Sequence, residues 1–187
     1  MDKLPKLFTN RLVLDQLNSS DIPKIIEYAG NSKIAEMTLN IPHPYEEKDA
    51  IFWLNRAHQG LKDKTEYSFA VRLKSSEAFI GGIGLMVNNR FNLAEFGYWI
   101  AEPFWNNGYA TEATRALLEF GFEELQLNKI HASHLIGNPA SGRVMIKNRM
   151  IKEGELKDHV RKDDVYNSLI QYRLTRSEFS ELQNIKQ

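Results

Sequence analysis

The sequence predicts an α+β fold with a central mixed sheet, and two observations carry that prediction. Between residues 66 and 101, three apolar segments of strand length are separated by short polar turns, which is typical of an antiparallel meander. Farther on, the strand-like segments 94–101 and 129–136 enclose a helical segment. This second pair is therefore expected to be parallel, with a right-handed crossover between its strands.

The first third of the chain predicts one strand and two helices. Leucines at positions 12, 14 and 17 predict a strand over residues 11–17. The polar residues 19–21 supply N-cap chemistry for a helix that carries isoleucines on one face and ends at Gly30. A second helix is expected over residues 46–61, where apolar residues recur at helical spacing.

The remaining two thirds predict a meander, a crossover and a final hairpin. The expected elements are strands at 66–73, 79–87 and 94–101, a long helix at 108–125, a strand at 129–136, a helix at 140–148 and strands at 155–160 and 165–174. Thr175-Arg176-Ser177-Glu178 matches a capping box and predicts a short helix after the last strand. No linker divides these elements, so residues 1–187 are expected to form a single domain.

Composition limits the function classes. The chain has 187 residues, 24 basic and 24 acidic side chains, and no cysteine. A chain without cysteine has no thiolate nucleophile, disulfide framework or cysteine-ligated metal site. It also fits a reducing compartment, so a cytoplasmic protein is expected. Charge neutrality argues against nucleic-acid binding through bulk counterion release, and no segment approaches the roughly 20 apolar residues of a membrane span.

One strand, loop and helix segment carries chemistry. After the strand at 94–101, the chain turns and enters a helix through Asn106, Asn107, Gly108, Tyr109, Ala110 and Thr111. The first amides of a helix have no partner within it, and with the helix dipole they attract an anion. Small residues at positions 108 and 110 would let a phosphate approach the backbone. A lone glycine before a helix more often makes only a turn, and neither a Walker loop nor a Gly-x-Gly-x-x-Gly fingerprint is present.

The same segment resembles the acetyl-CoA-binding signature of the GNAT superfamily of N-acetyltransferases. In that signature an Arg/Gln-x-x-Gly-x-Gly/Ala turn follows a strand. Here Gly108 and Ala110 match, and Trp105 stands at the Arg/Gln position. With Gly97-Tyr98-Trp99-Ile100 before the turn and Thr111-Glu112-Ala113 after it, the segment is similar to the RimJ/RimL branch, the ribosomal-protein N-terminal acetyltransferases and their relatives.

The likeness extends over most of the chain. It includes residues 119–130 and an Asn-x-x-Ser motif at Asn138-Pro139-Ala140-Ser141. It is specific from residue 94 to 154 and weaker elsewhere between 7 and 175. The resemblance implies a GNAT-type central mixed, mostly antiparallel sheet with helices on both faces and one parallel pair splayed at the cofactor site.

The resemblance also implies acetyl-CoA as a co-substrate and no metal. The implied cofactor-binding positions are Trp99, Ile100, Ala101, Trp105, Asn106, Asn107, Gly108, Tyr109, Ala110, Thr111, Asn138 and Ser141. The main chain of residues 99–101 would pair with the extended pantetheine arm as an added strand. Asn138 would hydrogen-bond the same arm where the parallel strands diverge, and a helix cap before Pro139 is the alternative role for Asn138.

Two positions depart from the family pattern. A Lys-Leu-Gly-Phe element usually follows the Asn-x-x-Ser helix, whereas Lys147-Asn148-Arg149-Met150 stands here and puts Arg149 where glycine is expected. Asn106 likewise replaces a common glycine. The first change is expected to alter the helix exit and the second to reduce loop flexibility. Neither change removes the anion site.

Glu95 is the leading candidate for the general base. Alternation along the strand places Glu95, Gly97 and Trp99 on one face, from which the carboxylate can point into a cleft; a solvated strand glutamate is the equal alternative. His131 and His134 are rivals, but they project to opposite faces of their strand. Ser141 is the implied proton donor to the leaving thiolate, with helix capping as the alternative.

The acceptor is expected to be a primary amine, carried by a peptide or a small molecule. With no cysteine to carry the acetyl group, direct transfer in a ternary complex is the simplest route. Deprotonation at pH 7 costs about 1 kcal/mol for an α-amine and about 4.6 kcal/mol for a lysine amine, so one carboxylate suits a protein N-terminus, such as that of a ribosomal protein.

Two alternative functions stay open. A small-molecule acceptor (an amino acid, polyamine or antibiotic) would be favoured by an enclosed cleft with a paired acidic wall, and a non-catalytic CoA-binding module by the lack of a working base. The cleft is expected between the first two helices and the late hairpin, with Phe52 and Trp53 as candidate lining residues. The charged segment 153–164 is expected to form a solvated hairpin near the acceptor. The oligomeric state is open, with a homodimer as one candidate.

Overall fold

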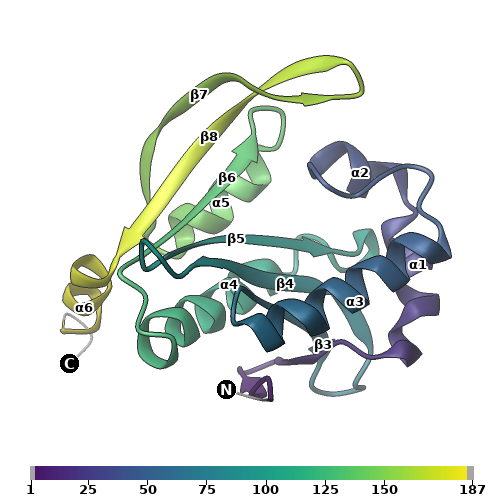
Figure 1. Cartoon of the computed structure of the whole chain (residues 1–187), viewed down its shortest axis with the longest axis horizontal. Coiled ribbons are helices and arrows are strands. Elements are labelled where there is room, and N and C mark those ends of the chain that lie inside the picture. The colour runs from purple at the N-terminus through teal and green to yellow at the C-terminus, as the bar shows by residue number, and fades with distance from the viewer. Residues whose placement is uncertain (1–2, 185–187) are drawn as a thin grey trace.

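The computed structural model describes residues 3–184 and contains an eight-stranded sheet with the order β1-β2-β3-β4-β5-β6-β8-β7 (Figure 1). The strands are β1 (Leu7–Phe8), β2 (Leu12–Gln16), β3 (Glu66–Leu73), β4 (Phe79–Asn88), β5 (Leu93–Ile100), β6 (Lys129–Leu135), β7 (Ile151–Lys162) and β8 (Val165–Thr175). Neighbouring strands are antiparallel except β5 and β6. The predicted mixed, mostly antiparallel sheet with one parallel pair is confirmed.

Helices cover both faces of the sheet. They are α1 (Ile22–Ala29), α2 (Ser32–Met37), α3 (Glu47–Asp63), α4 (Tyr109–Glu119), α5 (Pro139–Lys147) and α6 (Arg176–Asn184). One buried cluster joins α1 and α3 to Trp99 of β5, and another joins α4 to Phe96 of the same strand. Because residues 96 and 99 lie on opposite faces of a strand, the two helix layers enclose the sheet, with α3 in front of it and α4 behind it in Figure 1.

The structure differs from the prediction at several elements, which include the unpredicted strand β1 and a strand β7 that begins at Ile151 rather than at residue 155. The prediction contains no α2, because a six-residue helix that buries only Ile34 and Ala35 is too short to show a period. The helix expected over 108–125 is α-helical only as far as Glu119 and continues as a π-helical turn. The first helix is preceded by a 3₁₀ turn at residues 19–21, and its capping side chain is that of Asn18, which accepts from the Ser20 amide.

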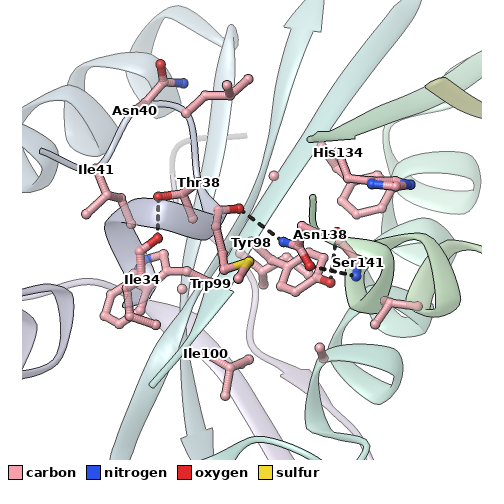
Figure 2. A pocket seen from close by; sticks show the side chains of 18 of the residues that line it. Ile34, Thr38, Asn40, Ile41, Tyr98, Trp99, Ile100, His134, Asn138 and Ser141 are labelled. Carbon is pink, nitrogen blue, oxygen red and sulfur yellow. Dashed lines mark hydrogen bonds between the residues drawn. The ribbon is translucent and has the colours of Figure 1, made fainter. Parts of the chain in front are cut away.

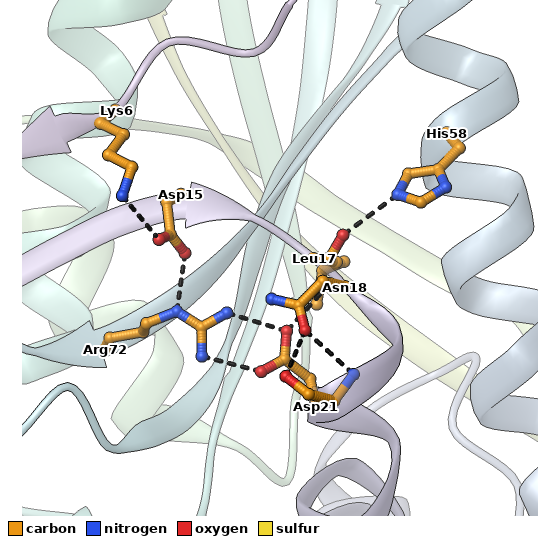
Figure 3. Close-up of polar contacts among 8 residues, drawn as sticks. Lys6, Asp15, Leu17, Asn18, Asp21, His58 and Arg72 are labelled. Carbon is orange, nitrogen blue, oxygen red and sulfur yellow. Dashed lines mark hydrogen bonds and ion pairs between the residues drawn. The ribbon is translucent and has the colours of Figure 1, made fainter.

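A buried polar network fixes the start of α1 against the sheet. The guanidinium of Arg72 on β3 donates to Asp15 at 2.7 Å and to both carboxylate oxygens of Asp21 at 2.7 and 2.8 Å (Figure 3). Asp21 also accepts from the Asn18 amide at 3.0 Å, which completes a capping box. The charges of this network are therefore used within the fold and are not available for catalysis.

The parallel ladder between β5 and β6 is short, and the candidate site lies where it ends. Its pairs are Leu93 with Lys129, Ala94 with Ile130, and Glu95 with His131. Beyond them β5 stays paired with β4 and β6 with β8, so the two parallel strands part.

The helices between residues 3 and 184 include none with the length and apolar character that a membrane span requires.

Candidate active site

A cavity of about 880 Å³ lies where β5 and β6 part. Figure 2 shows its centre, where Tyr98 and Trp99 lie between the segment Ile34–Ile41 on one side and α5 on the other. The cavity extends to the first turn of α4, called here the α4 end. In the other direction it extends to the face of α3 that carries Asp49, Trp53 and Arg56, called here the α3 end.

The α4 end is built as an anion site. Gly108 has φ +78°, and the first bond of the helix runs from the Glu112 amide to the Gly108 carbonyl at 3.1 Å. The amides of residues 109–111 therefore have no partner within the helix. Arg143 and Lys147 of α5 also line the cavity, which adds two cationic side chains that the sequence interpretation did not include.

Arg11, from the turn between β1 and β2, bonds the segment 106–112, which is called the phosphate loop after its proposed ligand. Its Nε bonds Glu112 Oε2 at 2.7 Å, its Nη1 bonds the Asn107 carbonyl at 2.9 Å, and its guanidinium lies 4.7 Å from the Tyr109 ring centroid. The Arg11 amide also donates to Glu112 at 2.7 Å. Sequence reasoning missed this contact because nothing in a single sequence links positions 101 residues apart.

The predicted cofactor positions lie together with two exceptions. Trp99, Ile100, Trp105, Asn106, Gly108, Tyr109, Ala110, Thr111, Asn138 and Ser141 line the cavity, as does Glu95. Ala101 is fully buried and its amide donates to the Ile80 carbonyl at 2.9 Å, so it is not available to a pantetheine arm. Asn107 does not line the cavity, and its side chain closes the loop on the carbonyls of Phe104 and Trp105.

Both departures from the glycine pattern adopt the left-handed backbone region. Asn106 has φ +61° and Arg149 has φ +62°. Glycine reaches this region without steric cost, whereas other residues rarely do. The structure therefore explains why a glycine is expected at both positions, and it shows that the chain keeps the glycine-like geometry with other residues.

Tyr98, Ser141 and Asn138 form the centre of the cavity. Tyr98 donates its hydroxyl to Ser141 Oγ at 3.1 Å, and burial raises the pKa of Tyr98 although the Ser141 bond lowers it in part. Asn138 caps α5 by accepting from the Ser141 amide at 3.2 Å, and its Nδ2 donates to the Met37 carbonyl at 3.1 Å (Figure 2). Sequence reasoning missed Tyr98 as a partner of the serine.

Glu95 and His131 are the last pair of the parallel ladder, and their charges interact although no hydrogen bond joins their side chains to each other. The Glu95 carboxylate lines the cavity and makes no hydrogen bond or ion pair with residues 3–184. His131 Nδ1 is buried without a hydrogen bond, and burial lowers the pKa of His131 although Glu95 raises it in part. His134 points to the opposite face, stacks on Tyr172 and lines the cavity.

The floor of the α3 end is a set of strand rungs with little side-chain bulk. Gly84 pairs with Ser68 on one side and with Gly97 on the other. A Cβ at Gly97 would meet nothing within 4 Å. The rung of Ser68, Gly84 and Gly97 is called here the glycine trough. The next rung is Glu66, Met86 and Glu95, so one carboxylate lies on each strand beside β4, with the Met86 side chain between them.

Two contacts connect the α2 segment to the opposite side of the cavity. Lys162, at the end of β7, donates to the carbonyls of Ala35 and Thr38, the latter at 2.8 Å. Asn138 supplies the second contact through Met37. The predicted hairpin of charged residues is solvated along most of its length, and its Lys162 contacts the helix layer beside the cavity.

The chemistry of the site is that of acid–base groups and amides. Among residues 3–184, no group of three or more His, Asp or Glu side chains is arranged to hold a metal ion. The arrangement offers helix amides free to bind an anion, a half-buried Tyr–Ser pair and a carboxylate without a hydrogen bond or ion pair to residues 3–184 around one cavity. Such a set can bind a phosphorylated co-substrate, supply a proton and accept one.

Comparisons with known proteins agree with this geometry. A sequence model of the Acetyltransferase (GNAT) domain matches residues 11–151. The uncharacterized N-acetyltransferase YnaD of Bacillus subtilis is 30% identical over 174 residues, covering 92% of this chain and 98% of that protein.

Two solved structures share the fold. One is RimL, a ribosomal L7/L12 α-N-protein acetyltransferase in complex with CoA, with a TM-score of 0.85, 13% identity and coverage of 93% of this chain and 99% of that one. The other is spermidine N-acetyltransferase from Vibrio cholerae with CoA and spermine, with a TM-score of 0.78, 23% identity and coverage of 92% and 99%. The matched domain spans most of the chain and includes the anion site, so the chain belongs to the GNAT family of acetyltransferases.

Proposed function

We propose that the chain transfers an acetyl group from acetyl-CoA directly to a primary amine in the cytoplasm, with both substrates bound in the cavity. Acetyl-CoA supplies the thioester. The amides of residues 109–111, with Arg143 and Lys147, would hold its phosphates, and the main chain of Trp99 and Ile100 would pair with its arm.

Glu95 and the Tyr98–Ser141 pair would divide the proton transfers. The amine nitrogen forms a bond to the acyl carbon as the carbon–sulfur bond breaks. Glu95 would take the amine proton, directly or through water, because it lines the cavity and its carboxylate makes no hydrogen bond or ion pair with residues 3–184. Ser141 would return a proton to the leaving thiolate, and Tyr98, which donates to Ser141 at 3.1 Å, would orient its hydroxyl.

The acceptor we propose is the α-amine of a protein N-terminus, and the unpaired state of Glu95 carries this proposal. A single carboxylate suffices for an amine that is already partly neutral near pH 7, which describes an α-amine and not a lysine side chain. The relative RimL is named for an α-N-protein acetyltransferase activity, which supports the same class.

A small-molecule amine is the second candidate. Lys162 of β7 and Asn138 of α5 both bond the α2 segment, so the two sides of the cavity are joined there. A site closed on one side in this way favours a small acceptor. The structural relative from Vibrio cholerae is named for spermidine, so amines of this class occur among proteins with this fold.

Acetyl-CoA turnover, measured by thiol release, tests these functions. The assay compares N-terminal peptides, polyamines and aminoglycosides as acceptors. Preferred turnover of peptides supports the first candidate, and preferred turnover of polyamines or aminoglycosides supports the second. Saturable CoA binding without turnover of any acceptor would contradict the enzymatic proposal and favour a CoA-binding module.

A further inference from the structure

Arg56 is a cationic group in the α3 end of the cavity, and the proposed reaction does not use it. The α3 residues that line the cavity are Asp49, Phe52, Trp53 and Arg56, which recur at helical spacing on one side of the helix. Trp53 packs over the strand glycine Gly82, since a Cβ there would lie 2.5 Å from its ring. Arg56 follows Trp53 by one turn and lies above the Glu66 side of the trough.

A buried carboxylate fixes the orientation of this arginine. Arg56 Nε donates to Glu66 Oε2 at 2.8 Å and Nη2 donates to Oε1 at 3.3 Å, while Ser68 donates to the same Oε1 at 2.7 Å. Glu66 is only 8% exposed, so its position is set by the core. The remaining nitrogen, Arg56 Nη1, makes no hydrogen bond with residues 3–184, and a guanidinium held in this way offers a donor to a ligand oxygen.

The opposite wall of the trough carries the opposite charge. Glu66, Met86 and Glu95 form one rung across β3, β4 and β5, so the two carboxylates lie two strand spacings apart. Two spacings are about 9.6 Å between backbones, and the exposed side chain of Met86 lies between the two carboxylates, so an acceptor that meets both Arg56 and Glu95 lies over Met86. The remaining space suits one or two extended amino-acid residues at about 3.3 Å each.

We infer that the acceptor carries a carbonyl or carboxylate oxygen within one or two residues of its reacting amine, and that Arg56 binds this oxygen while Glu95 faces the amine. This inference rests on the proposed acetyl transfer and names its substrate class, which is a peptide N-terminus or an amino acid. A polyamine has no such oxygen, and its second cation would meet the guanidinium. Glu66 and Ser68 act as positioning residues for Arg56.

A comparison of two acceptors isolates the role of Arg56. One acceptor is Ala-Ala amide and the other, its analogue, is sec-butylamine, which keeps an amine beside a methyl-bearing carbon and carries no oxygen. Each variant is compared with the unchanged protein on the same acceptor, so the different pKa values of the two amines cancel. Arg56→Gln should lower kcat/KM for Ala-Ala amide about tenfold to a hundredfold, mainly through KM, because a bond from a charged donor is lost. The same substitution should change kcat/KM for the analogue less than about twofold, and Arg56→Lys should recover part of the loss.

Controls separate binding from folding. Arg56→Gln leaves the buried Glu66 without its ion pair, so the double variant Arg56→Gln/Glu66→Gln keeps the test valid if the single variant fails to fold. Arg161→Gln removes a comparably exposed, ion-paired arginine that does not line the cavity. This variant should keep the kcat/KM of the unchanged protein for both acceptors. The affinity for acetyl-CoA should be unchanged in all variants.

The outcomes distinguish the two levels of the proposal. Equal losses for Ala-Ala amide and its analogue, or no loss for either, would overturn the role of Arg56. Turnover of spermidine in preference to Ala-Ala amide by the unchanged protein would overturn the substrate class while leaving acetyl transfer in place. Absence of thiol release with Ala-Ala amide, the analogue and spermidine would overturn the proposed function itself.

Discussion

A side chain at Gly97 should stabilise the fold and at the same time block the acceptor. Gly97 is exposed on β5, lines the cavity, and would place a Cβ with no atom within 4 Å. Glycine in a strand interior is less stable than alanine by about 0.5–1 kcal/mol. Gly97→Ala should therefore raise the free energy of unfolding by that amount, which corresponds to about 1–4 °C in Tm for a chain of this size.

Substitution of Gly97 should also reduce turnover, and the loss should grow with the size of the new side chain. Valine at position 97 fills space between Glu95 and Trp99 that the acceptor must cross, and a steric misfit of about 1–3 kcal/mol corresponds to a roughly 5-fold to 150-fold loss of kcat/KM. Thiol release at varied acceptor concentration gives kcat/KM. Thermal unfolding gives stability, and calorimetric titration should show an unchanged affinity for acetyl-CoA.

Gly82→Ala is the matched control. It adds the same methyl group on the neighbouring strand β4, two residues from Gly84, and should lower the free energy of unfolding rather than raise it. Its Cβ would lie 2.5 Å from Cη2 of Trp53 and 3.2 Å from Nε1 of Trp99, so overpacking should destabilise the protein by about 1–3 kcal/mol. If Gly97→Val kept the kcat/KM of the unchanged protein, the acceptor would not pass over β5. If Gly97→Ala were less stable, the space above it would not be open.

Three further predictions concern the phosphate loop and the base. Gly108→Val should weaken acetyl-CoA binding about fivefold to thirtyfold, because holding a side-chain-bearing residue at φ +78° in the binding conformation costs about 1–2 kcal/mol; a folded variant with unchanged affinity would remove the basis for the phosphate site. Glu95→Gln should lower turnover about 10²-fold without changing the Kd for acetyl-CoA, and normal rates would show that Glu95 is not the base. Burial acts to raise the pKa of Glu112, but hydrogen bonds from Thr9 and Arg11 outweigh it and hold the pKa below its usual range. Since the folded pKa is the lower one, the stabilisation is complete above the unfolded pKa and is lost as the pH falls through the folded one. The unfolding free energies of the unchanged protein and Glu112→Gln should therefore differ near neutral pH and converge as the pH falls below the folded pKa of Glu112, and a constant difference would contradict this account.

The elements of the sheet were predictable because each is set by local periodicity. The strands around Phe69, Ile83 and Phe96 alternate or run continuously apolar between polar turns, and the crossover follows from a strand, a helix and a strand. The π-helical turn after Glu119 was not predictable, since one extra residue in a helical turn hardly changes the apolar pattern. The position of the anion site was predictable because a turn and a helix N-terminus are adjacent in sequence.

The side chains that complete the site could not be predicted, since they come from distant parts of the chain. Arg11 reaches the phosphate loop from the first hairpin, and Arg56 is fixed by Glu66 only once α3 packs on β3. Asn138 was expected to face a cofactor, yet its amide bonds the α2 segment, which the prediction did not contain. A single sequence gives the face on which a residue lies, but not which distant group it meets there.

The short parallel ladder links co-substrate concentration to thermal stability. Past the pair Glu95 and His131, the polar backbone groups on the β6 side of β5 have no strand partner within residues 3–184. The Ile100 carbonyl accepts from Trp105 Nε1 at 2.5 Å, and the rest depend on water or a bound chain. A molecule that pairs with this edge binds the folded state alone, so it stabilises the protein by about 2.7 kcal/mol at a hundred times its Kd. Core substitutions that lower the free energy of unfolding by a similar amount would leave the protein folded in cells rich in this molecule. In cells that lack it, the same substitutions would unfold part of the protein.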